Sequence, residues 1–150
     1  MTTAQAFAES ATSFTGTANI NHSDDLIVQQ NMTIGNITRR GPDNCDINFD
    51  WDSVNSNCAI VSGFVPAKIA GYFTSKNEIT VTDRTLTSKP EGANEDAFSW
   101  AGNGDGASFA DLYTDENGYT VLKIKPEITA IKSNAKDGTY VYTWTFSRAN

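Results

Sequence analysis

The residue types that carry most enzyme chemistry are scarce in this chain. His22 is the only histidine, and Cys45 and Cys58 are the only cysteines. One histidine excludes a histidine-rich metal site, and two cysteines cannot make a four-cysteine zinc site. The GxGxxG, GxxxxGKS/T, HExxH and GxSxG motifs are absent. Because His22 lies in the polar stretch Asn-His-Ser-Asp-Asp, we expect a solvated turn there. We predict no catalytic residues, no metal and no cofactor, and therefore a protein that is not an enzyme.

The cysteines are the first candidate pair. Cys45 and Cys58 are separated by thirteen positions in an acidic chain rich in Thr and Asn. An even cysteine count in such a chain favours a disulfide and an oxidising compartment. A bridge across this loop would stabilise the fold by roughly 3 kcal/mol in the chain-entropy model. The alternative is a pair of unrelated free thiols.

Acidic side chains are the second candidate. Asp46, Asp50 and Asp52 alternate with apolar residues, so with Asn48 they would line one face of a strand. Such a face could hold calcium or a basic partner, but we expect solvated charges that discourage edge pairing. The stretch Asn103-Gly-Asp-Gly and the acidic residues after it lack the spacing of an EF-hand loop, and we expect a turn there.

Size and charge limit the class of protein further. A chain of 150 residues fits one domain. Its net charge of −7 argues against nucleic acid and anionic membranes as partners, because phosphate binding requires a basic surface. No apolar run approaches the ~20 residues of a membrane span, so we expect none.

Apolar and polar residues alternate along most of the chain, which is the pattern of β-strands. We predict about eight or nine short strands, no sustained helical period and an all-β sandwich or barrel. Tight turns are expected at Asn117-Gly118 and Asp137-Gly138. The expected strands fall at residues 14–20, 26–37, 47–51, 59–65, 69–73, 79–81, 119–124, 128–131 and 140–146.

The segment from Asp83 to Asn117 departs from this pattern. It is rich in Gly, Asn, Asp and Ser, so we expect a long connection with one or two short strands. Its irregularly spaced aromatic residues could stack on a ligand such as a sugar, or could pack as a small core beneath the connection. These candidate ligand aromatics are Phe98, Trp100, Phe109 and Tyr113.

The two ends of the chain carry the most distinctive strand patterns. The N-terminal pattern has a glycine within its apolar face, and the C-terminal pattern has four aromatic residues on one face. A sandwich that lacks one strand can be completed by an extended segment whose alternate side chains enter the groove. The first segment could therefore be donated to a neighbouring copy, or could be the domain's own first strand. The two faces are Phe14, Gly16, Ala18 and Ile20, and Tyr140, Tyr142, Trp144 and Phe146.

The first residues suggest export. Ala6-Phe7-Ala8 before Glu9 resembles the end of a signal peptide. We expect residues 1–8 to be a signal-peptide remnant or a disordered tail. Residues 9–20 would form an N-terminal extension, followed by a β-domain over residues 21–150.

On these residues the sequence resembles the pilin subunits of bacterial chaperone–usher fimbriae, particularly archaic and spore-coat-like pilins and related pilin-like domains. Ser13–Ile20 resembles a donor strand, and Asp25–Ile37 resembles the opening strands. Gly118–Ile131 and Asp137–Phe146 resemble the closing pair. The match covers the two ends, less than half of the chain. Two features depart from many members: the cysteines lie away from the first strand, and the C-terminus lacks a penultimate aromatic residue.

The resemblance implies an immunoglobulin-like β-sandwich that is incomplete and is completed by donor-strand exchange. It implies an exported structural subunit of an extracellular fimbria, with roles in adhesion or biofilm. Its partners would be identical subunits, a periplasmic chaperone and an outer-membrane usher, with residues 9–20 as the donor strand. Two alternatives remain: a carbohydrate- or receptor-binding β-sandwich, and a phage capsid or tail decoration protein.

Overall fold

The computed structural model describes residues 12–22, 25–40, 45–93, 95–101, 107–133 and 135–148. Within these ranges the chain is all-β, and its one helical element is a short 3-10 turn, η1 (Lys76–Glu78). No helix in this part of the chain is long and apolar enough to cross a membrane. The expected signal remnant at residues 1–8, residues 9–11 of the extension and the turn at Asn103 lie outside the described residues.

Fifteen strands make up the described fold, and several of them are only two or three residues long. The long strands are filled by Thr, Ile, Val and aromatic residues, which suit a pleated, half-buried surface. The strands are β1 (Thr12–His22), β2 (Ile27–Gln30), β3 (Thr33–Arg39), β4 (Cys45–Asp46), β5 (Asn48–Phe49), β6 (Val54–Asn55), β7 (Ala59–Ser62), β8 (Ala67–Gly71), β9 (Ile79–Ser88), β10 (Phe98–Trp100), β11 (Ala107–Phe109), β12 (Tyr113–Thr114), β13 (Thr120–Pro126), β14 (Ile128–Ile131) and β15 (Gly138–Arg148).

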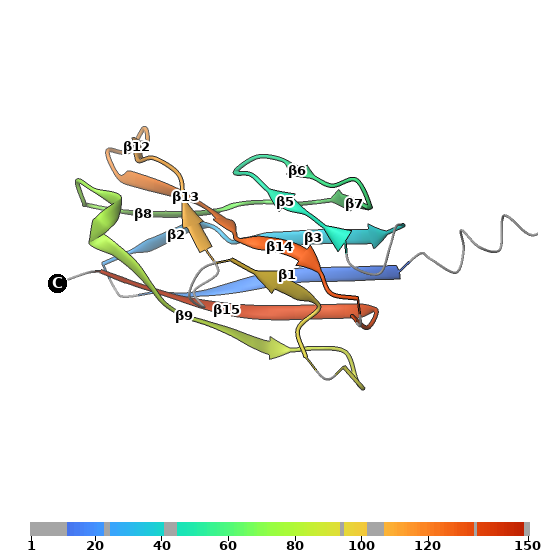
Figure 1. Cartoon of the computed structure of the whole chain (residues 1–150). Helices are drawn as coiled ribbons and strands as arrows, with labels where there is room; N and C mark the ends of the chain where they lie inside the picture. The colour runs from blue at the N-terminus through green and yellow to red at the C-terminus, as the bar shows by residue number, and fades with distance from the viewer. Residues whose placement is uncertain are drawn as a thin grey trace, which may run out of the picture.

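The strands form several sheets, an arrangement consistent with a β-sandwich (Figure 1). Two of them have five strands each, and the first, which we call sheet A, has the strand order β7-β3-β1-β15-β9. Sheet B has the order β11-β13-β8-β2, and β12 also pairs with β13. Two smaller sheets, β10-β14-β4 and β5-β6, complete the fold.

The core lies between the inner faces of these sheets. From β15 in sheet A, alternate aromatic side chains from Tyr140 to Phe146 are buried, while the residues between them are partly exposed. From sheet B, Ile69, Leu122 and Ile124 enter the same cluster. Burial of each large apolar side chain stabilises the fold by roughly 1.5–3 kcal/mol, so this shared cluster is what holds the two sheets together.

Two expected strands are divided in the structure. Residues 26–37 form β2 and β3, which belong to sheets B and A, with buried Met32 between them. The prediction of one strand was wrong because the chain changes sheets within a continuous apolar pattern. The expected strand at residues 47–51 is also interrupted: β5 ends at Phe49, and Trp51 lies in the bend that follows.

The expected connection from Asp83 to Asn117 is more ordered than its composition predicts. β9 continues to Ser88, and β10, β11 and β12 follow it, where one or two short strands were expected. Thr85 and Thr87 occupy exposed positions of β9, so these polar residues belong to the outer face of a strand. Asp83 pairs with Thr145 next to a register shift between β9 and β15.

The expected tight turn at Asn117-Gly118 is present, whereas at Asp137-Gly138 the chain only bends at Asp137 and Gly138 already begins β15. Gly118 in the β12–β13 turn has φ 86°, and Gly138 at the start of β15 has φ 137°, a region that favours glycine. In the first turn, the Asp115 carboxylate accepts hydrogen bonds from the backbone N–H groups of Asn117 (2.9 Å) and Tyr119 (3.0 Å).

Candidate functional site

β1 occupies an internal position in sheet A, between β3 and β15 (Figure 1). It runs antiparallel to β3 and parallel to β15. The parallel register pairs Gly16 with Tyr140, Ala18 with Tyr142 and Ile20 with Trp144. The two apolar faces that the sequence singled out therefore lie side by side within a single chain. This is the arrangement expected when the segment is the domain's own first strand.

Phe14 anchors the N-terminal end of β1. Its buried ring contacts the rings of Phe98 and Tyr140, with centroid distances of 6.3 and 6.4 Å. The guanidinium of Arg39, from β3, lies 5.8 Å from the centroid of the Phe14 ring. Because β3, β10 and β15 all contribute neighbours, Phe14 ties β1 to three other strands at once.

Gly16 lies where β1 approaches β3 most closely. A Cβ atom at this position would stand 2.9 Å from Cβ of Ile34 and 3.2 Å from its Cδ1 and Cγ2 atoms. A distance under 3.0 Å is shorter than real Cβ atoms show, so a larger residue would push β1 and β3 apart. The glycine within the apolar face therefore allows β1 to fit beside Ile34.

The four aromatic residues of β15 are buried, and each has defined neighbours. The Tyr140 hydroxyl donates a hydrogen bond to the Lys136 carbonyl oxygen (2.6 Å), and the Tyr142 hydroxyl donates to the Asp96 carboxylate. Burial raises the pKa of both tyrosines, and for Tyr142 the Asp96 charge raises it further. Ring contacts join Trp144 to Trp100 (5.6 Å) and Phe146 to Phe109 (6.2 Å).

Asp96 is a polar centre that the sequence did not single out. Besides Tyr142, its carboxylate accepts hydrogen bonds from the Trp100 indole (2.8 Å), the Phe98 backbone (3.0 Å) and the Arg84 guanidinium (3.5 Å). The Arg84 guanidinium also lies 4.3 Å from the Trp100 ring centroid. These donors fix β10 against β15. The signal in the sequence was an acidic residue in step with the alternating aromatics, two positions before Phe98 and four before Trp100.

The candidate ligand aromatics therefore have different surroundings. Phe98 is buried, while Trp100 and Phe109 are partly buried and pack against the aromatic residues of β15. Tyr113, on β12, is 41% exposed. Of these four residues, Tyr113 alone presents a largely open side chain.

Asp46, Asn48 and Asp52 are exposed and Asp50 is partly exposed, while Ile47 and Phe49 between them are buried, as expected for a solvated face. Asp52 forms an ion pair with Lys123 (2.6 Å), and Asp50 lies 4.0 Å from Lys125. Both lysines belong to β13, so the basic partner of these carboxylates lies within the chain. In the described part of the chain, no group of three or more His, Cys, Asp or Glu side chains could hold a metal ion.

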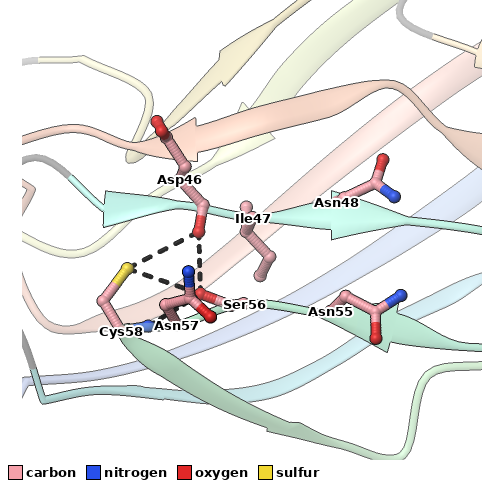
Figure 2. Close-up of a pocket in the computed structure, with 7 residues that line it drawn as sticks. All are labelled: Asp46, Ile47, Asn48, Asn55, Ser56, Asn57 and Cys58. Atoms are coloured by element: carbon pink, nitrogen blue, oxygen red, sulfur yellow. Dashed lines mark hydrogen bonds between the residues drawn. The ribbon is translucent and has the colours of Figure 1, made fainter.

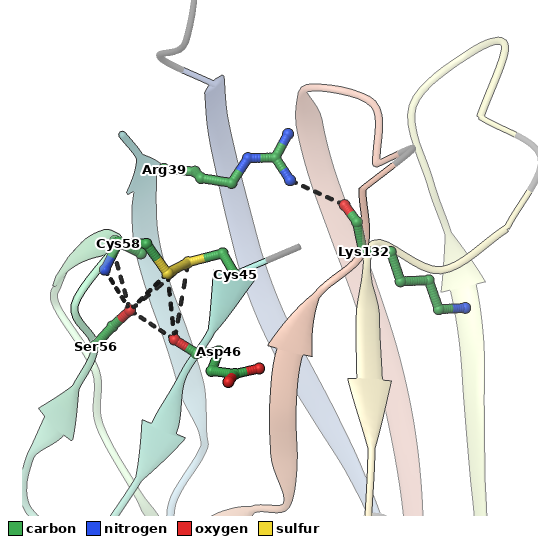
Figure 3. Close-up of a disulfide and its surroundings, with 7 residues drawn as sticks. Arg39, Cys45, Asp46, Ser56, Cys58 and Lys132 are labelled. Atoms are coloured by element: carbon green, nitrogen blue, oxygen red, sulfur yellow. Dashed lines mark hydrogen bonds between the residues drawn. A yellow bond between two sulfur atoms is a disulfide. The ribbon is translucent and has the colours of Figure 1, made fainter. Parts of the chain in front are cut away.

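Cys45 and Cys58 form the expected disulfide, with a Cα–Cα distance of 5.8 Å (Figure 3). The Ser56 hydroxyl donates to the Asp46 carbonyl oxygen (2.7 Å) and accepts from the Cys58 backbone N–H (3.2 Å). The disulfide thus links β4 to the segment before β7. Arg39, at the end of β3, donates to the carbonyl oxygen of Lys132, which follows β14 in another sheet (3.0 Å).

A surface pocket of about 460 Å³ lies beside this disulfide. Figure 2 shows its residues on two facing segments, with Ser56 hydrogen-bonded to Asp46 at the Cys58 end. The lining residues are Asp46, Ile47, Asn48, Asn55, Ser56, Asn57 and Cys58. Three of the lining residues carry side-chain amides, which can bind neutral polar groups, and the Ser56 hydroxyl is engaged with the Asp46 carbonyl oxygen.

An ion cluster lies where β15 ends. Arg148 pairs with Asp25, just before β2, and with Glu78 in η1, each at 3.1 Å, and also donates to the Tyr72 carbonyl oxygen. Hydrogen bonds from Thr74, and a weaker one from Arg148, lower the pKa of Glu78. The cluster connects the end of β15 to the connection that leaves β1.

Comparison with protein-family models, with curated proteins and with solved structures finds no match to this chain.

Proposed function

We propose that this protein is a structural subunit of an extracellular filament and that it assembles by exchange of β1 between neighbouring copies. In the assembled state, β1 of one copy would lie between β3 and β15 of the next. The fold would then be an immunoglobulin-like sandwich that is incomplete until a donor strand fills it.

In this structure β1 fills its own sheet, and the proposal is carried by what departure of β1 from its internal position would expose. β1 is the first strand described, yet two strands flank it in sheet A. If β1 left its own chain, the edges of β3 and β15 would be exposed together with the aromatic residues of β15. An exposed pair of edges is a template for another strand, and an identical strand from a second copy restores every lost contact.

The side-chain pattern of β1 supports the same function. Phe14 has a large side chain, Gly16 has none and Ala18 has a small one. Phe14 and Ala18 are buried, and a Cβ atom at Gly16 would clash with Ile34. This alternation lets an extended segment enter a groove with one face while the other stays at the surface.

β1 ends at His22 and β2 begins at Ile27. Exchange of β1 between copies would therefore require the chain to change its course only between these two strands. The disulfide between Cys45 and Cys58 is compatible with a secreted protein.

Paired cysteine variants test the exchange directly. Asn19 pairs with Thr143 across β1 and β15, and neither side chain is buried. We would refold Asn19→Cys chains together with Thr143→Cys chains, oxidise them and run non-reducing gels after boiling. Exchange predicts a covalent heterodimer in the mixture and a ladder from the Asn19→Cys/Thr143→Cys double variant. Ser62→Cys, on β7, replaces Thr143→Cys as the matched control and should give no heterodimer.

The same experiment can also overturn the proposal. If the mixture stays monomeric and the double variant closes its disulfide within one chain, β1 remains in its own sheet and the filament proposal fails. Negative-stain microscopy of the wild-type protein, with boiled and unboiled gel samples, gives an independent check. Thin filaments with a heat-sensitive ladder support exchange.

The second candidate function is a carbohydrate- or receptor-binding domain. Exposed tyrosines on sheet B favour it, and the two functions are compatible because β1 lies in sheet A.

A further inference from the structure

The outer face of sheet B carries an unusual set of side chains, which we call the tyrosine face. Ile27, Tyr72 and Tyr113 are 42%, 70% and 41% exposed, and they are three of the four large hydrophobic residues exposed in the described part of the chain. Ile60, the fourth, lies on β7 of sheet A. Exposed apolar residues that gather on one face mark a binding surface more often than scattered ones do.

The strand register brings these residues together. Ile27 pairs with Ala70, Ala70 with Val121, and Val121 with Tyr113, so one row crosses β2, β8, β13 and β12. Residues that pair directly share a face of the sheet. Ala70 and Val121 are fully buried but stand outside the main core cluster. The neighbouring exposed side chains therefore cover them from the outside.

Tyr72 and Tyr119 extend this row at one end. Their ring centroids are 5.1 Å apart and the rings are tilted by 44°. Beside them, the Asp115 carboxylate accepts a hydrogen bond from the Gln29 amide (2.6 Å). The face thus has an aromatic surface edged by fixed polar groups.

Lysines lie at the other end of the same face. Lys68 on β8 pairs directly with Lys123 on β13, an unfavourable arrangement for like charges. Lys123 has Asp52 as a partner, and Lys125 contacts Asp50 and the Trp51 ring (4.2 Å). The Lys68 side chain has no hydrogen bond or ion pair within the described ranges, and the residue is partly exposed. Its ammonium group is therefore accessible to an anionic ligand, although the protein as a whole is acidic.

We propose that the tyrosine face binds an acidic oligosaccharide, with a sugar ring against Tyr72 and a carboxylate of the sugar chain near Lys68. The flat, weakly polar face of a pyranose can stack on an aromatic ring such as that of Tyr72. The hydroxyl groups of the sugar need hydrogen-bond acceptors at the edge of the ring, such as the Asp115 carboxylate. Tyr72, just after β8, is four positions beyond Lys68, about 13 Å at the rise of a strand. That span suits two or three sugar units. The net charge of −7 disfavours densely charged polyanions but allows one carboxylate at a single lysine.

Trigalacturonate and its fully methyl-esterified, neutral form are matched probes. Titration calorimetry of the whole chain should show binding of trigalacturonate, weaker binding of the ester, and loss of that preference in high salt. Tyr72→Ala should weaken trigalacturonate binding by about tenfold or more. Lys68→Gln should bind trigalacturonate only as tightly as the wild type binds the neutral ester.

Two variants serve as controls for these changes. Ile60→Ala removes an exposed apolar side chain from sheet A, and Lys89→Gln removes an exposed lysine after β9. Both should bind trigalacturonate as the wild type does. Because Tyr72 is mostly exposed, Tyr72→Ala should keep the wild-type melting temperature, which separates lost binding from lost folding. Absence of binding to the wild type at millimolar probe, or equal binding by Tyr72→Ala, overturns the proposal. Equal affinity of the wild type for acid and ester overturns the role of Lys68.

Discussion

Two aromatic regions of this protein differ in how their polar atoms are used. In the β1–β15 region, the four aromatic rings of β15 are buried, and polar atoms such as the Tyr140 hydroxyl and the Trp100 indole have acceptors within the chain. On the tyrosine face, Tyr72 and Tyr119 contact each other at the surface, and Lys68 lies beside Lys123. The first region packs its rings against other rings of the core. The second leaves the Tyr72 ring and the Lys68 charge accessible to a partner.

This difference shows that aromatic content alone does not identify a binding site. The four aromatics expected to bind a ligand were chosen because they lie in a polar segment, yet three of them pack against β15. Exposure depends on which face of which sheet a residue occupies. Tyr113 is open because it lies on the outer face of sheet B.

Removal of the Phe14 side chain should have the largest effect. Phe14→Ala deletes a buried ring that contacts Phe98 and Tyr140, so we expect the free energy of unfolding to fall by about 3–5 kcal/mol. Urea denaturation of purified monomer measures this change. The neighbouring Thr15→Ala, whose side chain is partly exposed, should change it by less than about 0.5 kcal/mol. Equal effects of the two variants would mean that β1 is not part of the folded core in solution.

A methyl group at Gly16 should have a smaller effect. Gly16→Ala forces Cβ against Ile34, and overpacking of this kind costs about 1–3 kcal/mol. In an Ile34→Ala background the two contacts at 3.2 Å disappear, so the same change should cost less. A double-mutant cycle measures the coupling. Additive costs would show that the Cγ2 and Cδ1 atoms of Ile34 do not limit the space at position 16 in solution.

Local pattern was enough to predict several of these features. Alternation identified the buried faces of β1 and β15, because residues two apart in a strand share a face. The cysteine count favoured the bridge between Cys45 and Cys58, which is present. Asn-Gly predicted the turn at Gly118, where φ is positive.

Features that depend on register could not be predicted in this way. The row from Ile27 to Tyr113 joins four strands that are distant in sequence, and a shift of one residue would turn its side chains to the other face. Asp96 gains its role only when β10 and β15 approach each other. The change of sheet at Met32 is likewise decided by tertiary packing and not by the local pattern.

Acid should have the smallest effect, and it tests how the two regions are joined. Arg148, at the end of β15, contacts Glu78 and the carbonyl oxygen of Tyr72. The pKa of Glu78 is lowered in the folded protein, mainly by hydrogen bonds from Thr74 and also by Arg148. Its stabilising contribution is therefore present above the unfolded pKa of about 4.3 and is lost as the pH falls through the lower folded value.

Urea midpoints at about pH 6 and about pH 3 should thus differ less in Glu78→Gln than in the wild type. The control Glu91→Gln changes an exposed glutamate after β9 and should keep the wild-type difference. If Glu78→Gln shows the full wild-type loss in acid, the carboxylates that titrate in unfolding lie elsewhere. The link between β15 and Tyr72 would then rest on the Arg148 contact to the Tyr72 carbonyl oxygen, which does not titrate. In that case Tyr72 would stay linked to β15 in acid, even if the free energy of unfolding of the protein falls.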